Sequence, residues 1–327
     1  MNPIRLINLG AVPPWQTQAI YHALGERMDE NQPDTIVLCR PNEPYLCLGY
    51  HQVFESIFDP AECARRGLPV YRRRLGGGAT YLDGNQIFYQ CIFHHTHMPV
   101  MLKDIYSFAL AGPVNTLKRL GLNGELRETN EIEVDGKRIA GTGGGRIEDA
   151  AIVVGNVLFD FDYEAMTAVW EAPNTAFRSL AQKALHQRIV TMKDLMPNVS
   201  MEQVETMLIE DFAKSMKREI QLGTLTDEEW QAAEGEAKEL ASSEYLDLHK
   251  SDVNSEPMRN LKISARAFIR YTEADVNGFH VRGTFWLSEE IIQEAVLESA
   301  PERDWKSVEQ ILRGVAFKDW QEKLTEI

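Results

Sequence analysis

The sequence lacks several features that would assign it to a particular class of protein. None of its apolar runs approaches the ~18–20 residues that a membrane-spanning helix needs. The N-terminus has no basic stretch followed by an apolar core, so we expect no signal peptide. Only four cysteines are present and none forms a CxxC pair, which favours reduced, partly buried thiols over disulfides: Cys39, Cys47, Cys63 and Cys91. These absences predict a cytoplasmic protein that does not bind a membrane.

Positive charge is also scarce. The chain has 34 basic and 49 acidic residues, which gives a net charge of −15. That balance argues against a general nucleic-acid binder, and it repels an anionic substrate unless basic residues are concentrated at one place. Five arginines lie within one short segment, directly before three glycines: Arg65, Arg66, Arg72, Arg73 and Arg74. We therefore expect a local basic site in an acidic protein.

Apolar spacing and turn residues predict an α+β protein with two domains. We expect a large domain over 1–248, a linker over 249–260 where periodicity is lost, and a small α+β unit over 261–327. In the large domain, helices are predicted at 17–28, 60–66, 103–121, 202–218 and 226–242, strands at 35–39, 45–50, 68–74 and 151–161, and hairpins at 79–95 and 131–142. In the small unit we predict a hairpin with its turn at Asn277-Gly278, a helix at 289–299, then the segment WKSVEQILRG and a final helix at 316–325.

The stretch YRRRLGGGATYLDGN (71–85) is the first candidate for chemistry. Three glycines without Cβ atoms let backbone N–H groups approach an anion closely, and neighbouring arginines can donate fork-shaped hydrogen bonds to phosphate or carboxylate. The stretch is neither a Walker loop nor a dinucleotide fingerprint, because no Gly-Lys-Ser/Thr follows and the glycines open a strand. A flexible surface turn beside solvated charges remains the alternative.

The second candidate is EIEVDGKRIAGTGGGR (131–146), where Asp135-Gly136 predicts a two-residue hairpin turn. The expected cross-strand pairs are Val134 with Lys137, Glu133 with Arg138, and Ile132 with Ile139. Strand alternation then places Lys137 on the apolar face, where an ammonium is costly unless it meets a reacting phosphate or carboxylate. The alternative is that Lys137, next to the turn, extends to water. Gly141 and 143–145 are expected to form a second glycine loop.

Other polar residues are weaker candidates. Asp83 and Asn85 can bind a ligand or a metal, but Asp-Gly-Asn is first of all turn chemistry. The spacing of His94, His95 and His97 fits no standard zinc site, and a surface strand end is favoured. Asp160 and Asp162 are candidates for Mg²⁺. Cys39 and Cys47 resemble nucleophiles, but in the sequence neither lies beside a glycine loop or a base.

These motifs resemble the lipoate–protein ligase family within the wider biotin/lipoate ligase group. The family signature R-R-x-[ST]-G-G-G-A-V-x-H-D-x-G-N stands here at 72–85, and Gly49-Tyr50-His51-Gln52 is similar to its G-x-N-Q. The segment 135–141 resembles D-G-K-K-I-S-G, which carries the lysine needed for adenylation. VGNVLFD (154–160) parallels H-G-T-L-L-L-D, and RGTFWLSEEIIQEAV is similar to an accessory-domain segment. The chain departs from the pattern at Leu75, Leu82 and Val154, and one residue is missing before Gly84.

The resemblance implies an α+β fold whose large domain has a mixed, mainly antiparallel sheet flanked by helices, with a small C-terminal accessory domain. It implies ATP-dependent activation of lipoate as lipoyl-AMP, with Mg²⁺, and transfer to a lysine of a lipoyl domain or H-protein-like acceptor. We expect a monomer. Lys137 would be catalytic, bridging carboxylate and α-phosphate. The substrate-binding residues it implies are Gly49, Arg72, Arg73, Gly76, Gly77, Gly78, Ala79, Asp83, Asn85, Gly141 and Gly155.

Two rival functions remain. An acyltransferase of the same fold takes octanoyl from a carrier protein without ATP. Those that form a thioester need a cysteine near the acyl site, and this chain has none after Cys91. That absence and the accessory domain favour the ligase. A non-catalytic lipoyl-binding module is the other rival, which an inward-facing Lys137 argues against.

Overall fold

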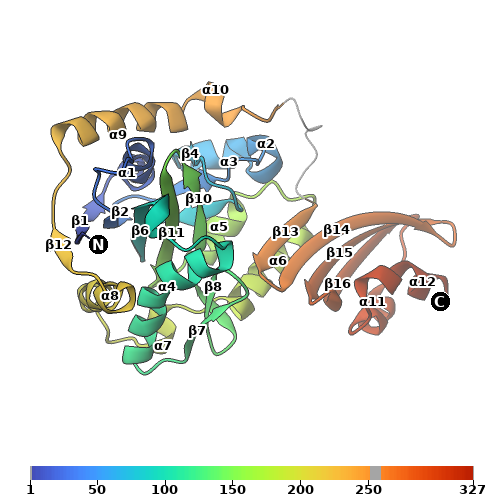
Figure 1. Ribbon diagram of the computed structural model, residues 1–327. Coiled ribbons are helices and arrows are strands. Elements are labelled where there is room, and N and C mark those ends of the chain that lie inside the picture. Colours follow the sequence, from blue (N-terminus) through green and yellow to red (C-terminus); the bar gives the residue numbers. More distant parts are fainter. Residues whose placement is uncertain (1, 251–258, 327) are drawn as a thin grey trace. The chain divides into compact units, whose positions relative to one another are not determined.

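The structure is a computed structural model that describes residues 2–250 and 259–326 (Figure 1). The chain divides into two compact units. The first comprises 1–54, 64–161 and 190–252, and the second comprises 55–63, 162–189 and 253–327. Most of the expected linker, at 251–258, lies outside the described residues. The unit that holds the C-terminal sheet thus also includes two earlier segments, and the domain boundaries expected at 248 and 261 stay a prediction.

The first unit is built on a six-stranded sheet in the order β10-β11-β6-β2-β1-β12. Its strands are β1 (Ile4–Val12), β2 (Thr35–Pro41), β6 (Gln86–His94), β10 (Thr142–Ile147), β11 (Ala150–Leu158) and β12 (Ile220–Leu222). β1 pairs in parallel with β2 and β12, and the other three pairs are antiparallel. The expected mixed, mainly antiparallel sheet is confirmed.

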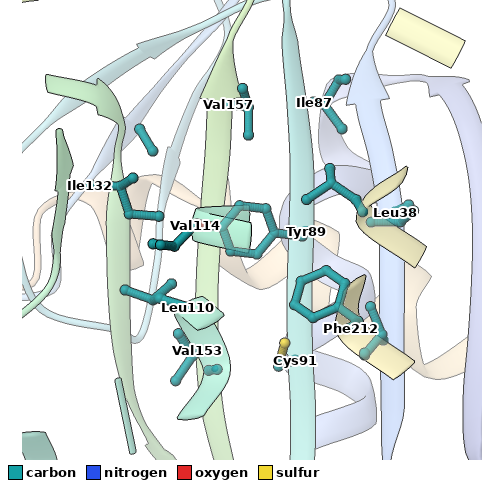
Figure 2. Close-up of a cluster of buried hydrophobic side chains, with 14 of the residues drawn as sticks. Leu38, Ile87, Tyr89, Cys91, Leu110, Val114, Ile132, Val153, Val157 and Phe212 are labelled. Atoms are coloured by element: carbon teal, nitrogen blue, oxygen red, sulfur yellow. The ribbon is translucent and has the colours of Figure 1, made fainter. Parts of the chain in front are cut away.

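Helices cover both faces of this sheet, because successive side chains of its central strand are apolar on both sides. Ile87, Tyr89 and Cys91 of β6 pack with residues of α4 (Leu102–Arg119) and α8 (Met201–Met216), as Figure 2 shows for Leu110, Val114 and Phe212. Phe88 and Ile92 belong to a second cluster with α1 (Pro14–Glu26) and α9 (Asp227–Leu240). Complete burial of each such side chain contributes about 1.5–3 kcal/mol. The helices expected at 17–28, 103–121, 202–218 and 226–242 are confirmed within a few residues.

Two small sheets complete the first unit. One has the order β4-β3-β5 and the other is the antiparallel meander β7-β8-β9. Their strands are β3 (Tyr45–Leu48), β4 (Val70–Arg72), β5 (Thr80–Leu82), β7 (Gly124–Arg127), β8 (Glu131–Val134) and β9 (Lys137–Ala140). The hairpin expected at 79–95 is wrong, because β5 pairs with β3 whereas β6 joins the large sheet. The turn at Asp83 redirects the chain from one sheet to the other.

The hairpin at 131–142 is confirmed, with one difference in register. Asp135 and Gly136 both have positive φ, 49° and 76°, as a type I′ turn requires. Val134 pairs with Lys137 and Glu133 with Arg138, but Ile132 pairs with Ala140 because the register shifts between Ile132 and Glu133. The expected pair of Ile132 with Ile139 is therefore wrong, since a bulge adds one residue to β9.

The second unit contains an antiparallel sheet, β13-β14-β15-β16, against which α6 packs. Its elements are α5 (Tyr163–Ala168), α6 (Thr175–Arg188), β13 (Asn260–Ser264), β14 (Ala267–Val276), β15 (Phe279–Ser288), β16 (Ile291–Ala300), α11 (Lys306–Leu312), η3 (Phe317–Asp319) and α12 (Trp320–Thr325). The Asn277-Gly278 hairpin is confirmed. The helix expected at 289–299 is wrong, because this segment is β16. A bulge in its pairing with β15 puts Ile292, Ala295 and Leu297 on one face, a spacing that imitates a helix.

The remaining elements are short: α2 (Phe54–Ile57), α3 (Pro60–Arg65), η1 (His95–His97), α7 (Met192–Leu195) and α10 (Ser243–Leu246). Within residues 2–250 and 259–326, the helices are too short or too polar to span a membrane. All four cysteines are buried and free, so they are more deeply buried than the partly buried thiols that we expected.

Candidate functional site

Arg73 holds the first glycine loop, Gly76–Gly78, from inside the protein. Its Nε and Nη2 donate to the Gly76 carbonyl at 3.1 and 2.8 Å, and Nη2 also donates to the Gly78 carbonyl at 2.8 Å. Its Nη1 lies 3.4 Å from the Cys47 sulfur, so this cysteine and the glycine loop contact the same guanidinium. The side chain is 9% exposed. A charged donor bonded to two carbonyls fixes the path of a loop that has no side chains of its own.

Gly49 and Gly77 pack backbone against backbone. A Cβ on Gly49 would lie 2.0 Å from the Gly77 carbonyl oxygen, so only glycine fits at this position. Gly77 has a φ of +98°, which other residues rarely adopt. The Gly49 N–H donates to the Gln52 side chain at 2.9 Å. The structure therefore brings together Gly49 and the 76–78 glycines, two of the motifs that the sequence predicted for one site.

The other two arginines of the run also bind protein atoms. Arg72 is fully buried and donates to five carbonyl groups, those of Gly49, Tyr50, Gln52, Tyr245 and Leu246. Arg74 forms ion pairs with Glu26, Glu236 and Glu239. The positive charge of 72–74 is thus engaged within the fold. Direct contact of Arg72 or Arg73 with a substrate stays a prediction.

A buried histidine supports the same arginine run. The Nδ1–H of His22 donates to the Gln18 carbonyl at 2.7 Å, and its Nε2 accepts the backbone N–H of Arg74 at 3.0 Å. Complete burial lowers the pKa of His22 to about 3, so the imidazole is neutral and can accept that hydrogen bond.

The second glycine segment is a strand, β10, and not the loop that we expected. Gly144 packs where a Cβ would lie 2.8 Å from the Ile152 carbonyl and 3.0 Å from the Tyr106 hydroxyl. A Cβ on Gly145 would lie 3.0 Å from Leu75, the residue directly before Gly76. Leu75 is 2% exposed, so the first loop and the second segment meet through this buried side chain.

Lys137 is exposed, so its predicted inward orientation is wrong. It is the first residue of β9, next to the turn, where water solvates an ammonium at no desolvation cost. Its neighbour Arg138 is half-buried, and its Nε donates to the Ala140 carbonyl at 3.0 Å. Nη2 of Arg138 lies 3.3 Å from the position that a Cβ on Gly141 would take. The guanidinium, and not the ammonium, is turned toward the start of the second glycine segment. The catalytic role of Lys137 stays a prediction.

Two buried amide side chains at the site were missed by the sequence analysis. Asn156 accepts the N–H of Gly141 at 2.7 Å and donates to Gln86 at 2.5 Å. Gln86 in turn lies 3.4 Å from Asp83, which caps the N–H of Asn85 at 2.9 Å. A signal was present for Asn156, because this amide interrupts a strand that is otherwise apolar or glycine, whereas Gln86 stands at the start of its strand and gave no such signal.

The remaining predicted residues lie near these segments. Ala79 is half-buried directly after the first loop, and Asn85 is exposed. Gly155 pairs with Tyr89 across β11 and β6, and a Cβ on Gly155 would lie 2.4 Å from the tyrosine oxygen. This glycine therefore makes room for a buried ring. Its role in substrate binding stays a prediction.

The two carboxylates that were candidates for Mg²⁺ bind other groups of the protein. Asp160 pairs with Lys193 at 2.8 Å, and Asp162 caps α5. Across residues 2–250 and 259–326, one group of three ligand residues has its atoms within 4.8 Å: His94, His95 and Asp149. Nη2 of Arg146 lies 3.0 Å from Asp149 and 3.5 Å from His95, so a guanidinium already neutralises that carboxylate. A cluster of carboxylates for Mg²⁺ is therefore not formed by the described residues at the glycine segments.

A hollow of about 710 Å³ lies elsewhere on the first unit. Its walls are mainly apolar and come from the end of α4, from α7 and from α8: Leu120, Leu195, Met196, Pro197, Asn198, Val199, Glu202, Gln203, Thr206 and Met207. It includes none of the predicted site residues, so we do not connect it with the chemistry.

Comparison with known proteins matches this chain to one family and to several relatives. Residues 13–213 match the family described as the lipoyl protein ligase A/B catalytic domain. An octanoyltransferase LipM of Kyrpidia tusciae is 27% identical in an alignment of 240 residues that covers 66% of this chain and 85% of that protein. A lipoate-protein ligase A subunit 1 of Thermoplasma acidophilum is 26% identical in an alignment of 208 residues that covers 61% of this chain and 77% of that protein.

Solved structures show the same fold at low sequence identity. A bi-partite lipoate protein ligase from Thermoplasma acidophilum, studied with its E2 lipoyl domain, has a TM-score of 0.69 at 23% identity and covers 75% of this chain and 96% of that one. A lipoate-protein ligase A bound with ATP has a TM-score of 0.64 at 22% identity, with 75% and 98% covered. Because the matched family domain spans more than half of the sequence, this chain belongs to the lipoyl protein ligase A/B catalytic-domain family.

Proposed function

We propose that this chain transfers a medium-chain acyl group, octanoyl or lipoyl, to a lysine on an acceptor protein of the lipoyl-domain type. The carrying observation is that the motif glycines of the family domain meet in one place, with Gly49 against Gly77 and Leu75 against Gly145. Two cations, Lys137 and Arg138, follow the turn that leads into the second segment. Backbone without side chains beside positive charge suits an acyl carbonyl on which negative charge develops.

The favoured donor is octanoyl carried as a thioester on a carrier protein, because relatives of this chain are named octanoyltransferase. The amine of the acceptor lysine attacks the thioester carbonyl, the C–N bond forms, and the C–S bond breaks to release the carrier thiol. A cation at 137 or 138 stabilises the oxyanion of the tetrahedral intermediate, which exists after the C–N bond forms and before the C–S bond breaks. No cysteine follows Cys91, so the segment 140–160 supplies no thiol, and direct attack by the acceptor lysine needs none.

An ATP-dependent lipoate ligase is the second candidate. A 26% identical relative is named a lipoate-protein ligase subunit, and the absence of a thiol in the second motif suits a reaction without an acyl-enzyme. In this case the lipoate carboxylate attacks the α-phosphate and releases pyrophosphate, and the acceptor lysine then displaces AMP. Bound Mg²⁺ would neutralise the phosphates. Lys137 and Arg138 with the backbone of 141–145 suit an anion such as a phosphate. Asp160 and Asp162 accept hydrogen bonds from Lys193 and from the Ala165 N–H, so they are not arranged as ligands of a metal ion.

Mass spectrometry of a purified lipoyl domain separates these functions. The domain is incubated with the enzyme and either octanoyl-loaded carrier protein without ATP, or free lipoate with and without ATP and Mg²⁺. Acylation from the carrier without ATP supports the transferase. Acylation that needs ATP and releases pyrophosphate supports the ligase and rejects the transferase. If neither donor modifies the domain, the proposed function is wrong.

The two cations are tested with a matched set of variants. We propose that Lys137→Ala folds normally and loses about 100-fold or more of the transfer rate, because the family motif assigns this ammonium to the charge that develops on the reacting groups. Lys103→Ala, at an exposed position on α4, controls for loss of one positive charge. If Lys137→Ala transfers at the wild-type rate while Arg138→Ala does not, the catalytic assignment of Lys137 is wrong and the guanidinium is the acting cation.

A further inference from the structure

Two buried amides stand on a face of the main sheet that is otherwise mostly apolar. Gln86, the first residue of β6, is fully buried, and Asn156 of β11 is 9% exposed. Asn156 lies directly opposite Phe88, and Gln86 is opposite Leu158, so the two amides form a diagonal pair on adjacent strands. A buried amide is costly unless its donors and acceptor are satisfied.

The two amides are satisfied by each other and by atoms of the two glycine motifs. Asn156 Oδ1 accepts the Gly141 N–H at 2.7 Å, and the backbone N–H of Asn156 donates to the Gly141 carbonyl at 3.0 Å. Asn156 Nδ2 donates to Gln86 Oε1 at 2.5 Å. Gln86 Nε2 then lies 3.3 Å from the Tyr81 carbonyl and 3.4 Å from Asp83 Oδ1. A continuous chain of hydrogen bonds therefore joins the turn after the first glycine loop to the start of the second segment.

The far end of this chain is also where Arg138 is directed. The site of an absent Cβ on Gly141 lies 2.9 Å from Asn156 Oδ1 and 3.3 Å from Arg138 Nη2. A carbonyl oxygen and a guanidinium thus converge on one glycine, and a displacement of Gly141 displaces the backbone next to the guanidinium. The second connection between the motifs, Leu75 with Gly145, is apolar and fixes no hydrogen-bond direction.

We propose that Asn156 and Gln86 are a positioning pair, which sets Gly141 and Arg138 relative to the first glycine loop for acyl transfer. The inference rests on the proposed function. An amide suits each position, because its oxygen accepts a hydrogen bond while its NH2 group donates one or two. Asn156 uses its oxygen on Gly141 and its nitrogen on Gln86, and Gln86 passes the connection on to the Asp83 turn. Neither side chain needs to touch the substrate.

The kinetic test uses Asn156→Leu, Gln86→Leu and the double variant. We expect kcat for transfer to the lipoyl domain to fall about 10- to 100-fold in each, as displacement of a reacting group by about an ångström does, while KM changes less than about 2-fold. In the double variant both amides are gone, so thermal stability recovers relative to Asn156→Leu, whereas kcat does not. A merely structural pair would recover both together.

Thr116→Val is the matched control. Thr116 is 1% exposed and donates to Asp211 at 3.0 Å on the opposite side of the sheet, so its loss lowers stability without touching the glycine segments. We expect wild-type kcat from this variant. If its kcat falls in proportion to its stability, or if Asn156→Leu keeps kcat within about 2-fold of wild type, the positioning role is rejected.

Hydrogen exchange distinguishes failure of this inference from failure of the proposed function. Asn156→Leu is expected to speed amide exchange in peptides that cover 76–85 and 141–147, and to leave α8 unchanged. If the wild-type enzyme shows no acyl transfer but Asn156→Leu shows this exchange pattern, the proposed function is wrong and the connection between the motifs is supported. Unchanged exchange in both peptides rejects the connection itself.

Discussion

The two glycine segments of the first unit use the same residue type for different purposes. In 76–78 the chain is a loop, two of the three glycines have open space where a Cβ would be, and Arg73 fixes the path through the Gly76 and Gly78 carbonyls. In 143–145 the chain is part of strand β10, and glycine is needed at 144 because backbone and a tyrosine lie too close for a Cβ. The first segment is held by a side chain from outside, and the second is held by its own ladder of backbone pairs.

This difference shows that a run of glycines indicates a backbone that other atoms approach closely. It does not indicate whether that backbone is a loop or a strand. A loop depends on its anchors, so it is most sensitive to residues outside the run. A strand depends on packing, so it is most sensitive to substitutions within the run. Four predictions test this contrast.

The largest effect is expected from Arg73→Met, which removes the anchor of the first loop. Two carbonyls and a thiol lose their charged donor, so the free energy of unfolding should fall by about 4 kcal/mol, with loss of acyl transfer. Chemical denaturation and the mass assay measure the two effects. Arg27→Met, at an exposed position, removes the same charge and should change neither. Equal stability of the two variants would mean that Arg73 does not anchor the loop.

Gly49→Ala should have the next largest effect. The new Cβ would lie 2.0 Å from the Gly77 oxygen, so backbone must move and the free energy of unfolding should fall by about 3 kcal/mol. Gly76→Ala meets open space at an ordinary φ and should change stability by less than about 1 kcal/mol. Thermal denaturation compares them. Similar losses from both substitutions would contradict the close approach of 49 and 77.

Within the second segment, Gly144→Ala is expected to lower the free energy of unfolding by about 2 kcal/mol, because its Cβ would meet the Ile152 carbonyl at 2.8 Å. Gly143→Ala should be neutral or slightly stabilising, since its Cβ would meet only Val154 at 3.9 Å and alanine restricts the unfolded chain. Urea unfolding of the two variants decides. If they are equally stable, the packing assigned to β10 is incorrect.

The smallest effect is expected on the pH dependence of stability, through His22, which supports the arginine run before the first glycine loop. His22 has a folded pKa of about 3, below its ordinary value, so its contribution is complete above about pH 6.5 and is lost as pH falls toward 3. Between about pH 7 and pH 5.5, wild type should lose about 1 kcal/mol more than His22→Gln. Parallel pH profiles of the two proteins would show that His22 is not buried in its neutral form.

Much of the fold was accessible from the sequence because long amphipathic or apolar segments have little choice of structure. α4, α8, α9 and β11 follow directly from such segments. The errors arose where local pattern and pairing disagree. A bulge between β15 and β16 gave residues 291–300 a helix-like spacing, and the turn at Asp83 sends β5 and β6 to different sheets. Neither feature leaves a signal in the periodicity.

At the site, the structure brings Gly49 against Gly77, two residues that the family motif assigned to one site, while their role in substrate binding stays a prediction. The sequence misplaced Lys137. Strand alternation predicts the face of the sheet on which a side chain lies, but it does not predict whether other residues bury that face next to a turn. The sequence-based assignment of Arg72 and Arg73 to a substrate stays a prediction, but it did not foresee their partners within the protein. Their carbonyl partners come from segments distant in sequence, such as 245–246 for Arg72, which spacing along the chain does not predict.

The buried guanidinium of Arg72 has a consequence for the order in which the protein is made. Three of its carbonyl partners, at 49, 50 and 52, leave the ribosome before the arginine itself, but the last two, at 245 and 246, follow more than 170 residues later. Until those two residues are synthesised, the Arg72 guanidinium lacks two of its five carbonyl acceptors. The segment next to the first glycine loop is therefore completed only near the end of synthesis of this unit, so that its synthesis and the maturation of its candidate site finish together.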